Sequence, residues 1–372
     1  MSAMSVFAKL GGDLVQPDIL IPATIPLELS GEVVRSRICA FTDEEGREWA
    51  LRPDLTLPVA MMEVAARADG LTGQATRFYD GPVFRLPASK DEPAEFRQMG
   101  FEIFGASSKL STDVDMYSAI CEASMAEGVG QGYTQLGDLA IFPAFVDGLG
   151  LSRDIAAGLK RAFRQEGGVR AFMRADRTGA AANLAQRMSG MSRPEIEAFV
   201  EDIFALTGIR PIGERSSVEI VERLADRAQS NIGPELGPDV QTLVEQVLGI
   251  DVPAQKAAEH LSTLAKTFGI QTADAAIENL ALRLEGISCD ACRSFIDGAR
   301  FQTRFGRRFT YYDGFVFEIS AGDRPDLKLS PFATGGRYDG LLADLSNGAI
   351  DTTALGGVIM PYRFTTAEEA GS

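Results

Sequence analysis

The order in which strand-like and helix-like segments follow one another is the strongest constraint on the fold of this chain. Short apolar runs separated by turn residues fill both ends of the sequence, whereas helical periodicity dominates the middle. The pattern predicts a discontinuous core formed by residues 1–145 and 300–366. A mainly helical insertion is expected at 146–299, and residues 367–372 are expected to form a frayed tail.

Local signals define some of the expected elements. Apolar residues at helical spacing predict a helix that begins near Ser111 and runs to about Met125. Residues 78–86 read as two strands around an Asp80-Gly81-Pro82 turn. Within the expected insertion, Ser-x-x-Glu sequences at 192–195 and 216–219 match the capping box that begins a helix.

Composition excludes several classes of function. The chain has 36 basic and 52 acidic side chains, so its formal net charge is −16. Because nucleic-acid affinity depends on clustered Lys and Arg, this balance argues against a nucleic-acid partner. The sequence has neither a signal peptide nor a run of roughly 18 uncharged apolar residues, and its four cysteines form no disulfide framework. We therefore expect a protein of the reducing cytoplasm that does not bind membranes.

Asp54 and Thr56 are the first candidate pair of binding residues. On an extended strand, residues two apart point to the same face, where a carboxylate beside a hydroxyl suits an ammonium group. The alternative is an Asx-type turn after Pro53.

A second candidate group follows. Arg85 can bind a carboxylate or phosphate in bidentate fashion. Gln98 and Glu102 are four residues apart, so a strand would place both on one face among apolar neighbours. Burying a glutamate is costly unless it is paired, which indicates either a cationic or hydrogen-bonding ligand or an ion pair with a nearby arginine.

Two further segments lie near the C-terminal end. Residues 306–318 combine arginines with Tyr311 and Tyr312 and lead into an alternating strand, in which Phe315, Phe317 and Ile319 share one face. Residues 335–341 read Gly-Gly-Arg-Tyr-Asp-Gly-Leu, and such glycines allow close backbone approach to a ligand. The alternative for either segment is a hairpin corner with a surface arginine.

Taken together and in order, these segments resemble the core of the histidyl-tRNA synthetases. Members of that family carry a Leu-Arg-Pro-acid-x-Thr segment, a Phe-Arg motif before a Gln-x-Gly-x-Glu strand, a Tyr-Tyr-x-x-x-Val-Phe-Glu strand and Gly-Gly-Arg-Tyr-Asp. The resemblance implies an α+β fold: a class II synthetase-like antiparallel sheet of about six strands, flanked by helices and interrupted by the helical insertion. It also implies a homodimer that forms around Val15-Gln16-Pro17.

The resemblance further implies a pocket for L-histidine. Asp54 and Thr56 would bind its α-ammonium group with help from Gln98, while Arg307 and Gln98 would face the carboxylate. Arg308 is an alternative counterpart of Arg307. Glu102 and Tyr312 would read the imidazole nitrogens. The full set of implied histidine-binding residues is Asp54, Thr56, Arg85, Gln98, Glu102, Arg307, Tyr312 and Tyr338.

The nucleotide-binding parts of the synthetase pattern are altered. Pro87 stands where the family has an acid, Ala94 where it has an arginine, and Met360 where a glycine would lie beside the nucleotide. The acidic loop between Arg85 and Gln98 would repel a triphosphate. The chain also ends soon after Arg363, so no anticodon-binding domain is expected.

A chain that keeps the histidine pocket but has these departures resembles the regulatory subunits of short-form ATP phosphoribosyltransferases. That resemblance implies a non-catalytic protein without a cofactor. It would bind the short catalytic subunit in a hetero-oligomer, enable its activity and mediate feedback inhibition by histidine. The alternative is a ligase of the histidyl-tRNA synthetase type.

Two other features are interpreted as ordinary. Cys289 and Cys292 form a lone Cys-x-x-Cys without the second pair that a structural zinc site needs. His260, the single histidine, lies at the edge of an apolar helical stripe. We expect free thiols, a surface or half-buried histidine and no metal site, with redox sensing as the alternative for the thiols.

Overall fold

The computed structural model describes residues 2–90, 92–165, 167–174, 236–306, 311–321 and 331–364. Arg307, Arg308, both Ser-x-x-Glu sequences and the expected tail lie outside these residues. The chain divides into two compact units, one formed by Met1–Gly148 with Glu245–Ser372 and the other by Leu149–Val244. In the second unit, helices α7 (Arg153–Phe163) and α8 (Gly168–Arg174) pack where the Phe172 ring lies against Gly158.

A nine-stranded sheet organises the first unit, in the order β1-β5-β6-β12-β11-β10-β7-β9-β8. The six strands from β5 to β7 pair antiparallel, which confirms the expected sheet. Three short strands extend its edges, two of them in parallel pairs. The bounds are β1 (Asp13–Leu14), β5 (Ala75–Phe84), β6 (Glu95–Phe104), β7 (Tyr133–Asp138), β8 (Asp251–Pro253), β9 (Arg300–Gln302), β10 (Phe315–Ser320), β11 (Ala333–Arg337) and β12 (Ala354–Ile359).

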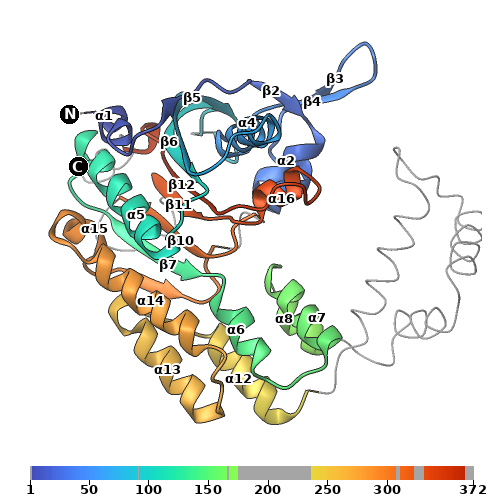
Figure 1. The fold of residues 1–372 in the computed structure, drawn as a ribbon, viewed down its shortest axis with the longest axis vertical. Helices are drawn as coiled ribbons and strands as arrows, with labels where there is room; N and C mark the ends of the chain where they lie inside the picture. Colours follow the sequence, from blue (N-terminus) through green and yellow to red (C-terminus); the bar gives the residue numbers. More distant parts are fainter. Residues whose placement is uncertain are drawn as a thin grey trace, which may run out of the picture. The chain divides into compact units, whose positions relative to one another are not determined.

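N-terminal strands form a smaller sheet in the order β2-β4-β3, which lies near the helix that follows β4 (Figure 1). Its strands are β2 (Leu20–Pro22), β3 (Ala40–Thr42) and β4 (Glu48–Leu51). Ala23, Ile38 and Ala50 form a small buried apolar cluster beside this sheet, and Leu27 packs against it.

Strand β5 corrects the expected turn at Asp80-Gly81-Pro82, because it runs without a break and pairs Gly81 with Gln98 and Pro82 with Arg97. Proline cannot donate to a ladder and is tolerated where one side of a strand is unpaired. Strand β1 reaches only Arg77 and Phe78 on the other side of β5, so Pro82 costs the sheet no hydrogen bond there.

Helix α5 (Lys109–Ala126) covers strands β11 and β12 and crosses in front of the sheet in Figure 1. Met116, Ile120 and Ala123 are buried, which confirms the predicted apolar face. The helix begins earlier than expected, because the Ser108 hydroxyl accepts a hydrogen bond from the Ser111 N–H and caps it.

The remaining described helices flank the two sheets or connect the strands. They are α1 (Ala3–Ala8), α2 (Thr24–Leu29), α3 (Glu32–Arg35), α4 (Thr56–Ala68), α6 (Ile141–Asp147), α12 (Pro238–Leu248), α13 (Ala257–Phe268), α14 (Asp274–Ile287), α15 (Arg293–Ile296) and α16 (Leu341–Leu345), with the 3-10 turns η1 (Ala254–Lys256) and η2 (Asp290–Cys292). Within the described part of the chain, none of the helices has the length and apolar character needed to cross a membrane.

A buried ionic network joins α5, α14 and the sheet. Asp113 is fully buried and accepts hydrogen bonds from Arg283 Nε at 2.6 Å and Arg337 Nε at 3.0 Å. Arg283 Nη1 donates to Asp138 at 2.9 Å, and Arg337 Nη1 donates to Asp339 at the same distance. Arg337 is therefore buried and joins Asp113 to Asp339, so the alternative of a surface arginine in residues 335–341 is wrong.

Candidate functional site

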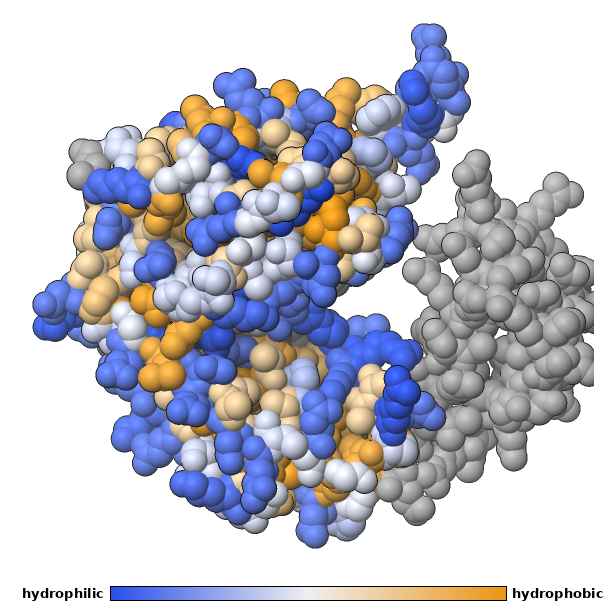
Figure 2. Space-filling model, viewed as in Figure 1, coloured by the Kyte–Doolittle hydropathy of each residue, from blue (hydrophilic) through white to orange (hydrophobic). Residues whose placement is uncertain are grey.

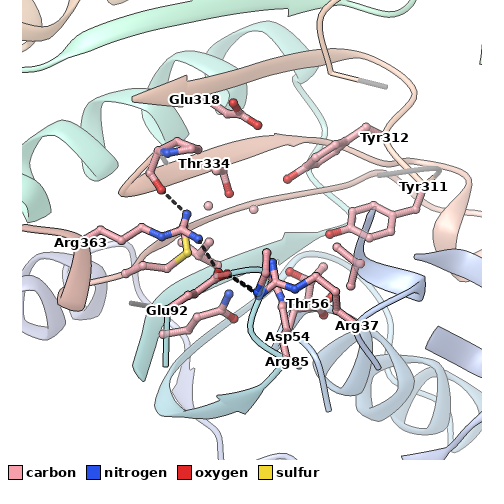
Figure 3. Close-up of a pocket in the computed structure, with 18 residues that line it drawn as sticks. Arg37, Asp54, Thr56, Arg85, Glu92, Tyr311, Tyr312, Glu318, Thr334 and Arg363 are labelled. Carbon is pink, nitrogen blue, oxygen red and sulfur yellow. Dashed lines mark hydrogen bonds and ion pairs between the residues drawn. The ribbon is translucent and has the colours of Figure 1, made fainter. Parts of the chain in front are cut away.

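A cavity of about 210 Å³ opens in the first unit, where β10, β11 and β12 meet the segments that precede α4 and follow β5 (Figure 3). Its lining is highly charged for such a small space. Three arginines and three acids contribute: Arg37, Arg85 and Arg363, with Asp54, Glu92 and Glu318. The balance of opposite charges suits a ligand that itself carries both signs.

Asp54 lies in the turn before α4 rather than on a strand. Its Oδ1 accepts a hydrogen bond from the Leu57 N–H at 3.0 Å, so the Asx-type turn is right and the extended geometry is wrong. Asp54 Oδ2 is buried and has no hydrogen-bond partner among the described residues. Burial raises the pKa of Asp54, while Leu57 and Arg85 act to lower it. An unpaired buried carboxylate oxygen is costly, which makes Asp54 Oδ2 the strongest candidate in the cavity for binding a cationic group.

Arg85 and Gln98 are held in place by the backbone around Asp54. Arg85 Nε donates to the Pro53 carbonyl at 2.7 Å, and the guanidinium lies 5.4 Å from the centre of the Phe96 ring. Burial lowers the pKa of Arg85, and the neighbouring Asp54 opposes this shift. The Leu55 N–H donates to Gln98 Oε1 at 3.1 Å. Gln98 therefore presents the donor side of its amide to the cavity, where both residues are part of the lining.

Glu102 lies behind the lining rather than in it. As expected, it shares a face of β6 with Gln98, and it is fully buried. Its Oε1 accepts a hydrogen bond from the Tyr79 hydroxyl at 2.7 Å, and its Oε2 accepts one from the Tyr338 hydroxyl. The partners are tyrosines, so the ion-pair alternative is wrong. Burial raises the pKa of Glu102 to about 8, although hydrogen bonds from Tyr338, Tyr79 and Thr56 lower it.

The raised pKa predicts a pH dependence of stability. Since Glu102 titrates near 8 when folded and near 4.5 when unfolded, the folded protein holds a proton that the unfolded chain releases. This contribution is fully present below pH 4.5 and is lost as pH rises towards 8. We expect Glu102→Gln, which mimics the protonated acid, to flatten the decline in free energy of unfolding from pH 5 to pH 9. Urea denaturation at four pH values measures it, and parallel curves for the two proteins would contradict the assignment.

Tyrosines form the other side of the site. Tyr311 and Tyr312 both line the cavity, and their ring centres are 4.9 Å apart. Tyr338 packs against both, at 5.6 Å from Tyr311 and 6.2 Å from Tyr312, but it is not part of the lining. Burial raises the pKa of both lining tyrosines, so their hydroxyls stay protonated and can donate hydrogen bonds.

The structure thus brings most of the expected residues to one place. Asp54, Thr56, Arg85, Gln98 and Tyr312 line the cavity, Glu102 and Tyr338 lie behind it, and Arg307 falls outside the described residues. Thr56 is the first residue of α4 and acts to lower the pKa of Glu102, which lies behind the lining.

Sequence reasoning missed Arg37, Glu92, Glu318 and Thr334. Glu318 and Thr334 lie opposite each other on β10 and β11. Glu318 ends the 306–318 segment and Thr334 directly precedes the 335–341 segment, so strand alternation could have indicated which face each side chain takes. Arg37 and Glu92 come from irregular segments, for which no periodic signal exists.

The cysteines and the histidine remain outside this site. Cys39, Cys121, Cys289 and Cys292 are unbridged. His260 is exposed, and its Nδ1 lies 2.9 Å from the Lys256 carbonyl oxygen. No group of side chains suited to holding a metal ion occurs in the described ranges.

Comparison with known proteins places these features in context. A family model described as histidyl-tRNA synthetase matches residues 1–193. An ATP phosphoribosyltransferase regulatory subunit of Chelativorans sp. is 30% identical over 91% of this chain and 89% of its own length. One from Mesorhizobium japonicum is 32% identical over 91% and 88%.

Among solved structures, an ATP phosphoribosyltransferase regulatory subunit/histidyl-tRNA synthetase from Bacillus halodurans superposes with a TM-score of 0.63. The match covers 98% of this chain and 76% of that one, at 18% identity. This likeness concerns the fold, and it agrees with the class II synthetase-like arrangement.

Proposed function

Because the chain belongs to the family of ATP phosphoribosyltransferase regulatory subunits, with a histidyl-tRNA synthetase-like core, we propose that its cavity binds L-histidine and relays feedback inhibition to a short catalytic subunit. In this proposal the chain performs no chemistry itself. It enables the partner, which joins ATP to phosphoribosyl pyrophosphate in the first step of histidine biosynthesis, in the cytoplasm.

The unpaired Oδ2 of Asp54 is the observation that carries the proposal. An α-ammonium group placed there would satisfy it, and the Thr56 side chain lies on the same wall. The Arg85 guanidinium and the Gln98 amide offer donors for the α-carboxylate. Tyr312 offers a hydroxyl to an imidazole nitrogen. Glu102 and Tyr338 are hydrogen-bonded to each other behind the lining residues and support them. In this arrangement Arg307 remains a proposed carboxylate ligand.

Feedback requires linkage between two sites. Histidine shifts the complex towards an inhibited arrangement only if it binds that arrangement more tightly, and the partner's state then changes histidine affinity by the same factor. The direct experiment mixes the chain with a short catalytic subunit and follows phosphoribosyl-ATP formation. We expect activity to depend on this chain and to fall with added histidine. Absence of a complex, or histidine-dependent ATP–pyrophosphate exchange by this chain alone, would favour the ligase alternative.

We also propose that the chain forms a homodimer through the surface around β1 and β2. Leu14, Ile19 and Leu20 are 58%, 44% and 45% exposed around a hollow that Val15 to Leu20 help to line. Figure 2 shows apolar side chains at the surface in the part of the first unit that carries β2 and β5. Clustered exposed apolar residues commonly mark a protein interface.

A charge placed in this surface tests the dimer. We expect Leu20→Glu to shift sedimentation from dimer to monomer, because an interface that buries a carboxylate without a partner is strongly weakened. Leu282→Glu is the matched control, since Leu282 is 42% exposed on α14. A Leu20→Glu protein that still sediments as the wild type does would remove this surface from the interface.

A further inference from the structure

We propose that Glu92 is a built-in anion that occupies a two-arginine subsite of the cavity and thereby excludes phosphate-bearing ligands. The inference deepens the proposed function, on which it rests for the role of the cavity, by naming the residue that restricts the pocket to an amino acid. Figure 3 shows Glu92 between Arg37 and Arg363, with dashed lines to both.

The contacts of the Glu92 carboxylate match those that a bound anion would make. Its Oε2 lies 2.7 Å from Arg37 Nη2 and accepts a hydrogen bond from the Ala88 N–H at 3.0 Å. Its Oε1 lies 3.7 Å from Arg363 Nη2. The side chains of Glu92 and both arginines are only 13–16% exposed. Two guanidinium groups and a backbone N–H around one carboxylate form an anion-binding arrangement.

The two arginines are held independently of Glu92. Arg37 Nε donates to the Leu86 carbonyl at 2.5 Å. Arg363 Nη1 donates to the Pro331 carbonyl at 2.6 Å, and its Nε donates to the Tyr362 hydroxyl at 2.7 Å. Because backbone and ring contacts fix both groups, removal of the Glu92 charge would leave a preorganised pair of cations rather than two relaxed side chains.

The charge of Glu92 also supports its role as the anion between the two arginines. Burial acts to raise the pKa of Glu92, but hydrogen bonds from Ala88 and Arg37 and the charges of Arg37 and Arg363 lower it overall. Glu92 is therefore ionised at neutral pH. Arg363 also acts to lower the pKa of Arg85, so the positive potential reaches deeper into the cavity. The field at this end is thus positive, and Glu92 supplies the local counter-charge.

A tethered carboxylate is a strong competitor. Glu92 reaches both arginines from the segment that follows β5, so it meets them as part of the same chain, and a dissolved anion must compete with this intramolecular contact. A phosphate group would have to displace it and would then lie close to a second negative charge. An amino acid avoids this competition, because its single carboxylate can bind at Arg85 and Gln98.

The test uses inorganic pyrophosphate without divalent metal as the probe. We expect isothermal titration to give no saturable binding to the wild type at millimolar concentrations. Glu92→Gln is expected to bind pyrophosphate saturably, with an affinity at least about tenfold above the weakest that this titration of the wild type can detect. Glu95→Gln, an exposed acid of the same region, is the matched control and should behave as the wild type. Adding Arg363→Gln to Glu92→Gln should abolish the gained binding, and Glu92→Ala should gain it as Glu92→Gln does.

Two other outcomes would contradict the inference. Equal pyrophosphate affinity in wild type and both Glu92 variants, with native circular dichroism, would overturn the exclusion role. Gained binding that survives the added Arg363→Gln change would place the anion elsewhere and overturn the subsite. Histidine titrations of the same proteins separate this inference from the proposed function. Gain of pyrophosphate binding without histidine binding in any variant would refute only the histidine pocket.

Discussion

Asp54→Asn is expected to weaken L-histidine binding by about 2–4 kcal/mol, or at least 30-fold, which is the largest effect we expect on the ligand. The substitution keeps the shape of the side chain and the Oδ1 acceptor for the Leu57 N–H. It removes the negative charge from Oδ2, the atom that lacks a partner. An amide in that position would leave the ligand's ammonium group desolvated and without a counter-charge.

The same variant should not be less stable without ligand. Burial disfavours the Asp54 carboxylate, so loss of its charge leaves the free energy of unfolding unchanged or raises it. Isothermal titration of histidine and urea denaturation measure the two effects separately. Asp69→Asn, at the exposed C-terminal end of the same helix, is the control. Histidine affinity equal to that of the wild type would exclude Asp54 from the pocket.

Asp113→Asn should produce the largest loss of stability, about 3–5 kcal/mol in the free energy of unfolding. Asp113 is fully buried and accepts hydrogen bonds from both Arg283 and Arg337. The asparagine keeps the volume but provides one acceptor where two guanidiniums need charge compensation. Asp138 and Asp339 would each still compensate one arginine, which keeps the expected loss within this range.

Urea denaturation at pH 7 measures this effect, and Asp115→Asn supplies the control. Asp115 lies on the same helix but is exposed, so its replacement should change stability by less than about 0.5 kcal/mol. A loss below 1 kcal/mol for Asp113→Asn would mean that Asp138 and Asp339 alone neutralise the two arginines.

The elements that could be predicted from the sequence are those with a regular period. Alternation placed Phe315, Phe317 and Ile319 on one face of β10, where all three are fully buried. The same reasoning placed Gln98 and Glu102 together on β6. These predictions succeeded because the period is set by backbone geometry and does not depend on distant residues.

The features that could not be predicted depend on tertiary contacts. Asp54 lies in a turn because its Oδ1 accepts a hydrogen bond from the Leu57 N–H. The two-residue period of a strand does not predict such a side-chain contact. The unbroken β5 depends on a neighbour that stops short of Pro82. The Arg37–Glu92 pair joins two irregular segments, and Glu102 meets tyrosines from distant positions. A single sequence carries no signal for these pairings.

The order of strands in the large sheet has a consequence for synthesis on the ribosome. Strand β6 pairs with β12, and Asp113 bonds to an arginine 224 positions later in the chain. At roughly 5–20 residues per second, about 10 to 45 s pass before that arginine has been added. During this time β6 lacks one of its two neighbours and presents an open edge to other nascent chains or to chaperones. A chain released before Ile359 lacks the strand that joins the two halves of the sheet.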